Sequence, residues 1–299
     1  MPVESAPSPL QLLTEALGGP TIPAVIALVG GGGKTTTMFG LSHHLRARGL
    51  RVIATTTTKM GASQTGGFAK VGTSFDEVVT GLRLHGAVIS VGIVHGHGER
   101  PKVGGLTDDV ITALIESGEV DAIVIEADGS RRHNVKAPAP HEPVIPSAAT
   151  HVVAVIGADA LDRVIEDQAH RPMRVAAAAN AQPYQRLTAE RAATLLMSDI
   201  GSRKSVPPDA VFVVVVTKVT NQSSDNANDV ARRVRAAGFP VVLFPFVTPP
   251  DPSHSSFDDA PGDETTDNHR TIHPTATPTM FPEPVGPDTR PRIPIDRQE

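Results

Sequence analysis

A run of four glycines between an apolar segment and a helical one constrains this chain more than any other feature. The run follows apolar residues 23–29, and residues 34–48 continue with apolar side chains three and four apart before Gly49. Glycines let backbone N–H groups turn toward phosphate oxygens, and the beginning of a helix adds the positive end of its dipole. The arrangement therefore predicts a strand, a phosphate-binding loop and a helix in succession.

The side chains after the glycines are those that a nucleotide-binding loop uses. We predict that Lys34 is a catalytic residue that reaches the β- and γ-phosphates, and that the Thr35 hydroxyl is a ligand of Mg²⁺. The nucleotide contacts predicted in this loop come from Gly30, Gly31, Gly32, Gly33, Lys34, Thr35 and Thr36. Leu28 stands where the longer motif G-x-x-x-x-G-K-T has its first glycine, so the spacing is G-x-x-G-K-T-T. This shorter form is similar to the ATP loop of the Mur peptide ligases.

Short apolar runs alternate with amphipathic segments along most of the chain. Strands are expected at residues 23–29, 51–54, 87–91, 121–125, 151–156, 211–216 and 241–246. Helices are expected at residues 7–18, 34–48, 75–84, 108–115, 187–197 and 226–237. Apolar strands separated by helices indicate a parallel sheet that is covered on both faces. The predicted fold class is α/β and P-loop NTPase-like, with a mainly parallel sheet flanked by helices and a disordered acidic C-terminal tail.

Composition divides the chain into three regions. We expect an N-terminal helix or extension at residues 1–19, a P-loop nucleotide-binding α/β domain at 20–247, and a disordered tail rich in Pro, Asp and Thr at 248–299. Residues 251–299 hold nine prolines and ten acidic residues against four arginines, and they show no helical or alternating period. Such a segment buries too little apolar surface to offset the entropy that it loses on ordering.

Charge and cysteine content exclude several classes of function. The formal net charge is −5 and the chain contains no Cys. The acidic balance argues against a nucleic-acid partner, and the absence of thiols excludes disulfides, iron–sulfur clusters and cysteine nucleophiles. No apolar run approaches the ~18 residues of a membrane span, and the N-terminus lacks the pattern of a secretory signal. We therefore expect a cytoplasmic protein without a membrane partner.

Two carboxylates follow the strand expected at residues 121–125. Glu126 and Asp128 are two residues apart, so both point to the same side if the strand continues. Carboxylates at such a strand end hold Mg²⁺ directly or through water in nucleoside-triphosphate sites. We predict both as catalytic residues and, with Thr35, as metal ligands. The alternative is a strand end with solvated acids.

Three further residues are predicted to contact the nucleotide. Thr57 and Lys59 follow the second strand beside the phosphate loop, although a threonine run also simply favours a strand. Lys218 lies in the sequence T-K-V-T after the strand at 211–216, where GTPases carry N-K-x-D. Thr220 replaces the Asp that would bind guanine, so ATP is favoured over GTP.

The polar stretch at residues 136–146 contains four prolines, which fix an extended connection beyond the carboxyl ends of the strands. It is either a substrate-binding segment or a rigid surface loop, and both interpretations stay open. Four histidines receive no role. Two of them form a His-Gly-His sequence that could bind a metal, but no clear third ligand lies nearby, so solvated loop positions are favoured for this pair. Of the other two, one lies in the proline-rich stretch and one precedes a helix, and the sequence near them indicates no specific function. The four histidines are His95, His97, His141 and His170.

Six separated motifs together resemble one protein family. In chain order they read VGGGGKTTTMF, ATTTTKM, KVGGL, EADGSRR, KAPAPHEPVIP and HRP, and they lie within residues 20–247. The combination resembles the accessory proteins of selenium-dependent molybdenum hydroxylases, the YqeC type. The resemblance implies a nucleotide-binding cytoplasmic protein whose partner is a molybdenum hydroxylase or a molybdenum-cofactor protein. Family members often carry N-K-x-D where this chain has T-K-V-T.

These predictions favour Mg²⁺-dependent binding and hydrolysis of a nucleoside triphosphate in the maturation of a molybdenum hydroxylase or its cofactor. Catalysis by Lys34, the loop amides and Mg²⁺ would then stabilise charge on the transferred phosphoryl group. Two alternatives stay open. One is a nucleotide-switched binding or chaperone module with little turnover, and the other is an ATP-dependent ligase, which the Mur-like loop suggests.

Overall fold

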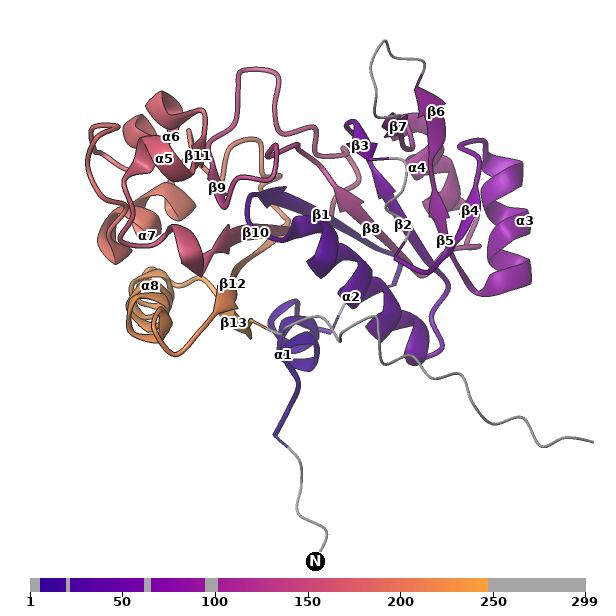
Figure 1. Cartoon of the computed structure of the whole chain (residues 1–299). Coiled ribbons are helices and arrows are strands. Elements are labelled where there is room, and N and C mark those ends of the chain that lie inside the picture. Colours follow the sequence, from indigo (N-terminus) through magenta and orange to yellow (C-terminus); the bar gives the residue numbers. More distant parts are fainter. Residues whose placement is uncertain (1–5, 20–21, 62–65, 95–101, 247–299) are drawn as a thin grey trace, which may run out of the picture. The chain divides into compact units, whose positions relative to one another are not determined.

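An eight-stranded sheet forms the centre of the computed structural model, which describes residues 6–19, 22–61, 66–94 and 102–246 (Figure 1). From edge to edge the strands are β13 (Val241–Pro245), β12 (Val211–Val219), β10 (His151–Gly157), β1 (Ala24–Gly30), β8 (Ala122–Glu126), β2 (Val52–Thr56), β5 (Ala87–Ser90) and β4 (Ala69–Val71). Every neighbouring pair is parallel, which confirms the predicted α/β class. The predicted tail, His95 and His97 lie outside the described residues.

Strand β1 lies inside the sheet, and all seven of its residues are buried. It pairs with β8 on one side and with β10 on the other. The register places Leu28 beside Glu126 and Gly30 beside Val155. Parallel strands present their carboxyl ends at one edge of the sheet, which is where α/β proteins bind ligands. The glycine loop and Glu126 therefore meet at that edge.

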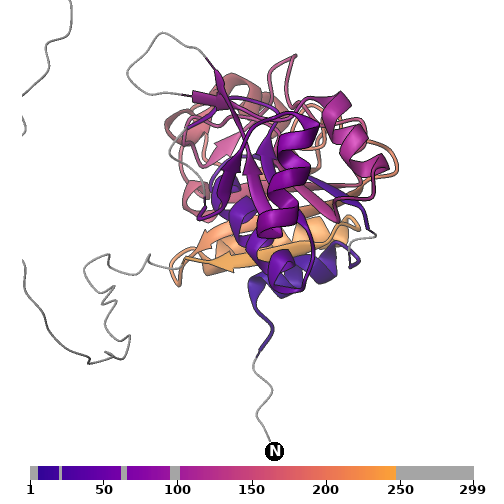
Figure 2. The same cartoon turned by 90° about the vertical axis from the view of Figure 1, so that its right-hand side faces the viewer.

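Helices cover both faces of the sheet. One face carries α1 (Pro9–Ala16) and α2 (Lys34–Ala47), and the other carries α3 (Phe75–His85), α4 (Asp108–Glu116), α6 (Pro172–Ala178), α7 (Ala189–Met197) and α8 (Ser224–Ala236). In Figure 1, α3 and α8 lie at opposite ends of the sheet, and Figure 2 shows α1 beside the C-terminal strands. None of the helices in the described ranges is both long and apolar enough to cross a membrane.

Local sequence signals explain where the helices begin and end. Ser74 and Glu77 form a capping box at the beginning of α3, and Gly86 ends this helix in the left-handed conformation. Helix α2 begins differently, because it follows Gly33, which has no side chain that could cap it. Its first backbone amides are therefore left for another acceptor.

The predicted helices and strands appear within a few residues of their expected limits, and the structure adds shorter elements. Strand β4 extends the sheet at one edge, and β3 (Met60–Gly61), β7 (Lys102–Gly104) and β6 (Gly92–Val94) form a small antiparallel sheet. A parallel pair joins β9 (Val135–Lys136) to β11 (Ala169–His170), and α5 (Ile165–Gln168) and a 3₁₀ turn at Ala158–Ala160 precede α6. Elements of two to seven residues are too short to show a hydrophobic period.

Candidate nucleotide-binding site

The glycine loop between β1 and α2 needs conformations and close approaches that other residues would prevent. Gly32 has a φ of 78° and Gly33 a φ of 124°, both in the left-handed region that favours glycine. A Cβ on Gly32 would lie 2.4 Å from the Gly157 nitrogen, and one on Gly30 would lie 2.3 Å from the Val155 oxygen. The loop therefore packs directly against the end of β10.

Four consecutive backbone amides at the beginning of α2 lack an acceptor. Within the described ranges, no acceptor contacts the amides of residues 33–36, and the first helical bond runs from Thr37 N to Gly33 O at 2.9 Å. The preceding amides are occupied, because Gly31 N donates to Val155 O at 2.9 Å and Gly32 N donates to His133 O at 3.0 Å. Free amides at the N-terminus of a 14-residue helix form a cradle for an anion.

The Lys34 side chain folds back into the loop. It is 3% exposed, and its Nζ donates to the Gly30 carbonyl at 2.6 Å. The same ammonium group lies 3.2 Å from Asp128 Oδ1 and 3.9 Å from Glu126 Oε1. A buried cation that is held by a carbonyl and carboxylates can exchange these contacts for phosphate oxygens.

The Thr35 hydroxyl donates to Glu126 Oε2 at 2.6 Å, across the gap between α2 and the end of β8. A hydroxyl and a carboxylate are hard oxygen donors, which Mg²⁺ prefers, and Mg²⁺ usually completes its shell with phosphates and water. In the part of the chain that the structure describes, no group of three or more His, Asp or Glu side chains could hold a metal without such help. The donor set at Thr35 and Glu126 therefore fits a nucleotide-bound Mg²⁺.

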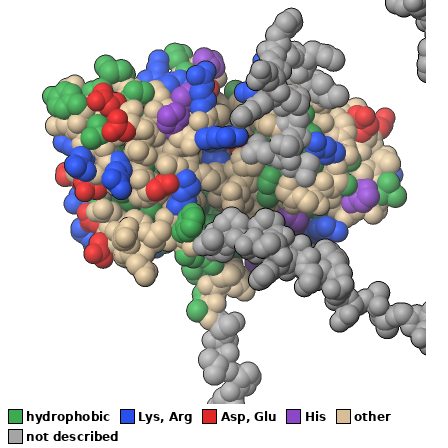
Figure 3. Space-filling view, in the orientation of Figure 1, with side chains coloured by type: hydrophobic (Ala, Val, Ile, Leu, Met, Phe, Trp, Pro, Cys, Tyr) green, Lys and Arg blue, Asp and Glu red, His purple; other side chains and the backbone are tan. Residues whose placement is uncertain are grey.

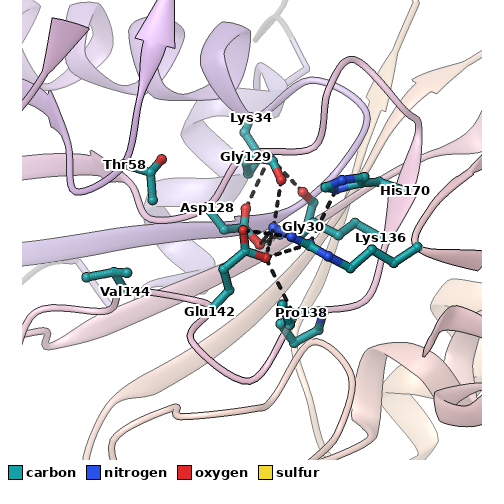
Figure 4. A network of polar contacts seen from close by, with 12 residues as sticks. Gly30, Lys34, Thr58, Asp128, Gly129, Lys136, Pro138, Glu142, Val144 and His170 are labelled. Atoms are coloured by element: carbon teal, nitrogen blue, oxygen red, sulfur yellow. Dashed lines mark hydrogen bonds and ion pairs between the residues drawn. The ribbon is translucent and has the colours of Figure 1, made fainter. Parts of the chain in front are cut away.

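Asp128 lies between two lysines rather than facing solvent (Figure 4). It is 2% exposed, its Oδ2 accepts from the Gly30 amide at 3.2 Å, and the same oxygen lies 3.1 Å from Lys136 Nζ. Its Oδ1 faces Lys34 Nζ. Asp128 thus fixes the beginning of the glycine loop and neutralises two buried ammonium groups.

A chain of ion pairs leads from Asp128 to the molecular surface. The buried Lys136 ammonium also donates to Gly129 O at 2.7 Å and lies 2.7 Å from Glu142 Oε2. Glu142 in turn accepts two hydrogen bonds from the Arg171 guanidinium, at 2.6 and 3.2 Å. Burial by itself would raise the pKa of Glu142, but hydrogen bonds from Lys136 and Arg171 outweigh it and lower the pKa to about 2.

His170 lies on β11 at the surface end of this chain, and its ring stacks with that of His133 at a centroid distance of 6.0 Å. Burial, which is the largest cause, and the neighbouring cations Arg171, Lys136 and Arg131 together lower the pKa of His170 to about 4, although Glu142 acts in the opposite direction. The imidazole is therefore neutral near pH 7. Figure 3 shows basic and histidine side chains gathered at the upper edge of this face of the molecule.

Lys218 lies at the other side of the glycine loop, near the end of β12. Its Nζ donates to Asn134 Oδ1 at 2.5 Å and to Asp159 Oδ2 at 2.9 Å. Asn134 and Asp159 also line a polar cavity of about 420 Å³, together with Arg163, Val164, Asp167, Gln168 and Arg186. Thr217 donates its hydroxyl to the Gly32 carbonyl, so the Lys218 segment is joined directly to the loop.

The threonine run after β2 divides into buried and accessible residues. Thr55 donates to Ser90 O at 2.8 Å and Thr56 to Glu126 O at 2.8 Å, so both hydroxyls hold the sheet together. Thr57 is half-buried and donates to Val144 O at 2.6 Å, while Lys59 is exposed. Thr57 and Lys59 follow β2, the strand beside β8, and their predicted contact with nucleotide stays a prediction.

The structure thus brings Lys34, Thr35, Glu126 and Asp128 to one place, and it adds residues that sequence reasoning missed. Lys136 is fully buried, whereas the proline-rich stretch around it suggested only a loop or substrate segment. Asn134, which directly precedes β9, accepts a hydrogen bond from Lys218. A single lysine or asparagine in a short polar segment carries no sequence signal that separates a buried position from a solvated one.

Sequence comparison identifies relatives of this chain. It matches the YqeC protein family over residues 26–173, which span the glycine loop, both carboxylates and Arg171. Uncharacterized protein YqeC of Escherichia coli (strain K12) is 36% identical over 199 residues, which cover 64% of this chain and 74% of that protein.

Solved structures with a similar arrangement are distant. Chloroplast FtsY from Physcomitrella patens is 15% identical, with a TM-score of 0.38, over 78% of this chain and 64% of that chain. The hydrogenase maturation factor HypB from Archaeoglobus fulgidus is 11% identical, with a TM-score of 0.35, over 79% of this chain and 86% of that chain.

Proposed function

The chain belongs to the YqeC family, and we propose that it binds a nucleoside triphosphate with Mg²⁺ and hydrolyses it during maturation of a molybdenum hydroxylase or its cofactor. The four acceptor-free amides at the beginning of α2, directly beside the buried Lys34 ammonium, support the binding of phosphates. The role in maturation rests on the family resemblance.

In the proposed complex, phosphate oxygens accept from the amides of residues 33–36. Lys34 exchanges its contacts with the Gly30 carbonyl and Asp128 for phosphate oxygens, while Asp128 keeps its ion pair with Lys136. Thr35 and Glu126 would hold Mg²⁺, which supplies positive charge beside the phosphates. Since negative charge spreads over the transferred phosphoryl group in the transition state, cations and amides fixed around it lower the barrier.

We propose ATP rather than GTP as the nucleotide. Lys218 and the cavity beside Asn134 and Asp159 would receive the nucleoside, because they adjoin the loop on the side away from Glu126. Thr220 stands where the guanine-binding Asp of GTPases would be, and its hydroxyl lies 3.2 Å from that of Ser223. Competition of ATP and GTP for the purified protein measures this preference, and tighter binding of GTP would contradict it.

A nucleotide-switched binding module is the second candidate, and the ion-pair chain favours it. When Lys34 turns to a phosphate, Asp128 loses one of its two cations, and the change reaches Glu142 and Arg171 through Lys136. A switch of this kind predicts that a non-hydrolysable analogue alters hydrogen exchange in residues 136–143 while turnover stays slow. Rapid turnover without that alteration would favour the hydrolase.

Nucleotide binding is tested with Lys34→Ala. The substitution removes a charge-assisted contact worth about 1.5–3 kcal/mol, so the affinity for ATP should fall at least tenfold. Isothermal titration calorimetry measures this affinity. Lys70→Ala, on the edge strand β4, is the matched control and should bind as the wild type does. Equal ATP affinity of the Lys34 variant and the wild type would contradict the proposal that the glycine loop binds phosphates.

A further inference from the structure

Two consecutive arginines form a strained turn that follows Asp128 after Gly129 and Ser130. Arg131 has a φ of 50° and Arg132 a φ of 67°, so both occupy the left-handed region that side chains disfavour. The turn is closed by a hydrogen bond from His133 N to Ser130 O at 3.0 Å. Strained backbone persists where the surrounding structure holds it, and it is concentrated at functional sites.

Both ends of this turn are attached to the glycine loop. On one side, Asp128 accepts from the Gly30 amide at 3.2 Å. On the other side, the His133 carbonyl accepts from the Gly32 amide at 3.0 Å. The backbone that carries the two arginines is therefore anchored to the loop at two positions, only two residues apart in the loop.

The two guanidinium groups add positive charge that nearby carboxylates do not neutralise. Among the described residues, no carboxylate forms an ion pair with Arg131 or Arg132. Asp128 is already paired with two lysines, and Glu142 is paired with Lys136 and Arg171. Both arginines are exposed and free to turn toward a ligand.

We propose that Arg131 and Arg132 bind the γ-phosphoryl group of the nucleoside triphosphate and stabilise its charge during transfer. The inference rests on the proposed nucleotide binding. In hydrolysis, a water oxygen bonds to the γ-phosphorus while the bond from phosphorus to the β–γ bridging oxygen breaks. The electron pair stays on that oxygen, a proton passes to solvent, and the products are the diphosphate and inorganic phosphate. Guanidinium groups suit this role because they present paired donors to phosphate oxygens.

The left-handed backbone offers a clean test. The double variant Arg131→Gly/Arg132→Gly removes both guanidinium groups, and glycine adopts the conformation of this turn without strain. We expect its affinity for the diphosphate to stay within about twofold, its affinity for a non-hydrolysable triphosphate analogue to fall about tenfold or more, and its turnover to fall about 10³-fold. Arg131→Lys/Arg132→Lys should lie between the wild type and the glycine variant.

Two controls separate charge from conformation. Asn180→Gly changes another exposed left-handed residue, which lies outside the glycine loop and the Arg131–Arg132 turn and has a φ of 51°, and Arg232→Ala removes an exposed arginine of α8. Both should match the wild type. If the double glycine variant keeps the preference for triphosphate over diphosphate, or loses affinity for both equally, the proposal is wrong. If the wild type binds neither nucleotide, the proposed function fails instead.

Discussion

Glu126 and Asp128 are separated by one residue, yet their surroundings give them different tasks. Glu126 accepts from Thr35 at the opening of the site, whereas Asp128 is enclosed with Lys34 and Lys136. Removing one member of a buried ion pair leaves an uncompensated charge, which costs more than the loss of a surface pair. The two residues were predicted together as catalytic and metal-binding, and the structure makes Asp128 a structural anchor as well.

We predict that Asp128→Asn lowers the free energy of unfolding by about 3 kcal/mol, because Lys34 and Lys136 then share too little negative charge. Glu126→Gln should leave stability nearly unchanged and should weaken the Mg²⁺ dependence of nucleotide binding and turnover. Urea denaturation and a Mg²⁺ titration of each variant measure the two effects. Equal stabilities of the two variants would contradict the prediction that the buried Asp128, unlike Glu126, stabilises the fold.

The neutral His170 makes stability depend on pH. Its folded pKa of about 4 lies below its ordinary value of 6.5, so the unfolded chain takes up a proton that the folded chain refuses. The free energy of unfolding should therefore fall as the pH drops from about 6.5 to about 4. His170→Gln should flatten the curve in this window when urea denaturation is repeated from pH 4 to 7.5. An unchanged slope would mean that another group causes the loss.

Glu142 also makes the protein less stable as the pH falls, but over a lower pH range than His170. Its pKa of about 2 in the folded protein lies below the ordinary 4.5, so its ion pairs contribute stability that is lost as the pH falls from about 4.5 toward 2. Glu142→Gln should therefore be less stable than the wild type at pH 7 and should lose less on acidification. A constant difference between the two proteins from pH 7 to 3 would contradict this origin.

At the scale of elements, the proposed nucleotide binding depends on the glycine loop that connects β1 to α2. Gly32→Ala would bring a Cβ within 2.4 Å of Gly157, in a loop where the backbone cannot retreat. We expect this variant to lose nucleotide binding and several kcal/mol of stability, roughly the scale of core overpacking. Calorimetry and thermal melting measure both losses.

Gly118→Ala is the matched control for that variant. Gly118 also has a positive φ, 67°, but a Cβ there meets nothing within 4 Å. The control carries the conformational strain without the clash, and strain alone costs about 1–2 kcal/mol. Nucleotide affinity should be unchanged in Gly118→Ala. If the two alanine variants behave alike, backbone strain rather than the contact with β10 limits the loop.

The sequence predicts the long elements of this fold because their apolar periods are repeated over enough residues to be read. Strands such as β1 and β12 and helices such as α2 and α8 lie where the pattern places them. The pairs β9–β11 and β3–β7 could not be predicted, since strands of two or three residues show no period and their partners are distant in sequence. The chain of ion pairs through Lys136 could not be predicted either, because it depends on which segments the fold brings together.

At the scale of the whole molecule, the described core is complete before the acidic segment begins. The chain forms a compact unit over Met1–Pro249, and its buried apolar residues run from Leu13 to Val242. We therefore predict that a chain ending at residue 249 keeps the melting temperature and nucleotide affinity of the full protein. Differential scanning calorimetry and ATP titration compare the two. A melting temperature several degrees lower after truncation would show that residues 250–299 stabilise the body.

The position of β1 in the sheet also determines when this strand can find its partners during synthesis of the chain. Its neighbours β8 and β10 begin at Ala122 and His151, so one edge of this apolar strand stays open until residue 122 has been made and the other until residue 151, about halfway along the chain. At ~5–20 residues per second, synthesis leaves β1 unpaired for on the order of ten seconds. Open apolar edges invite association with other nascent chains. The proposed nucleotide site is also incomplete during this interval, because the glycine loop packs against β10, which ends at Gly157.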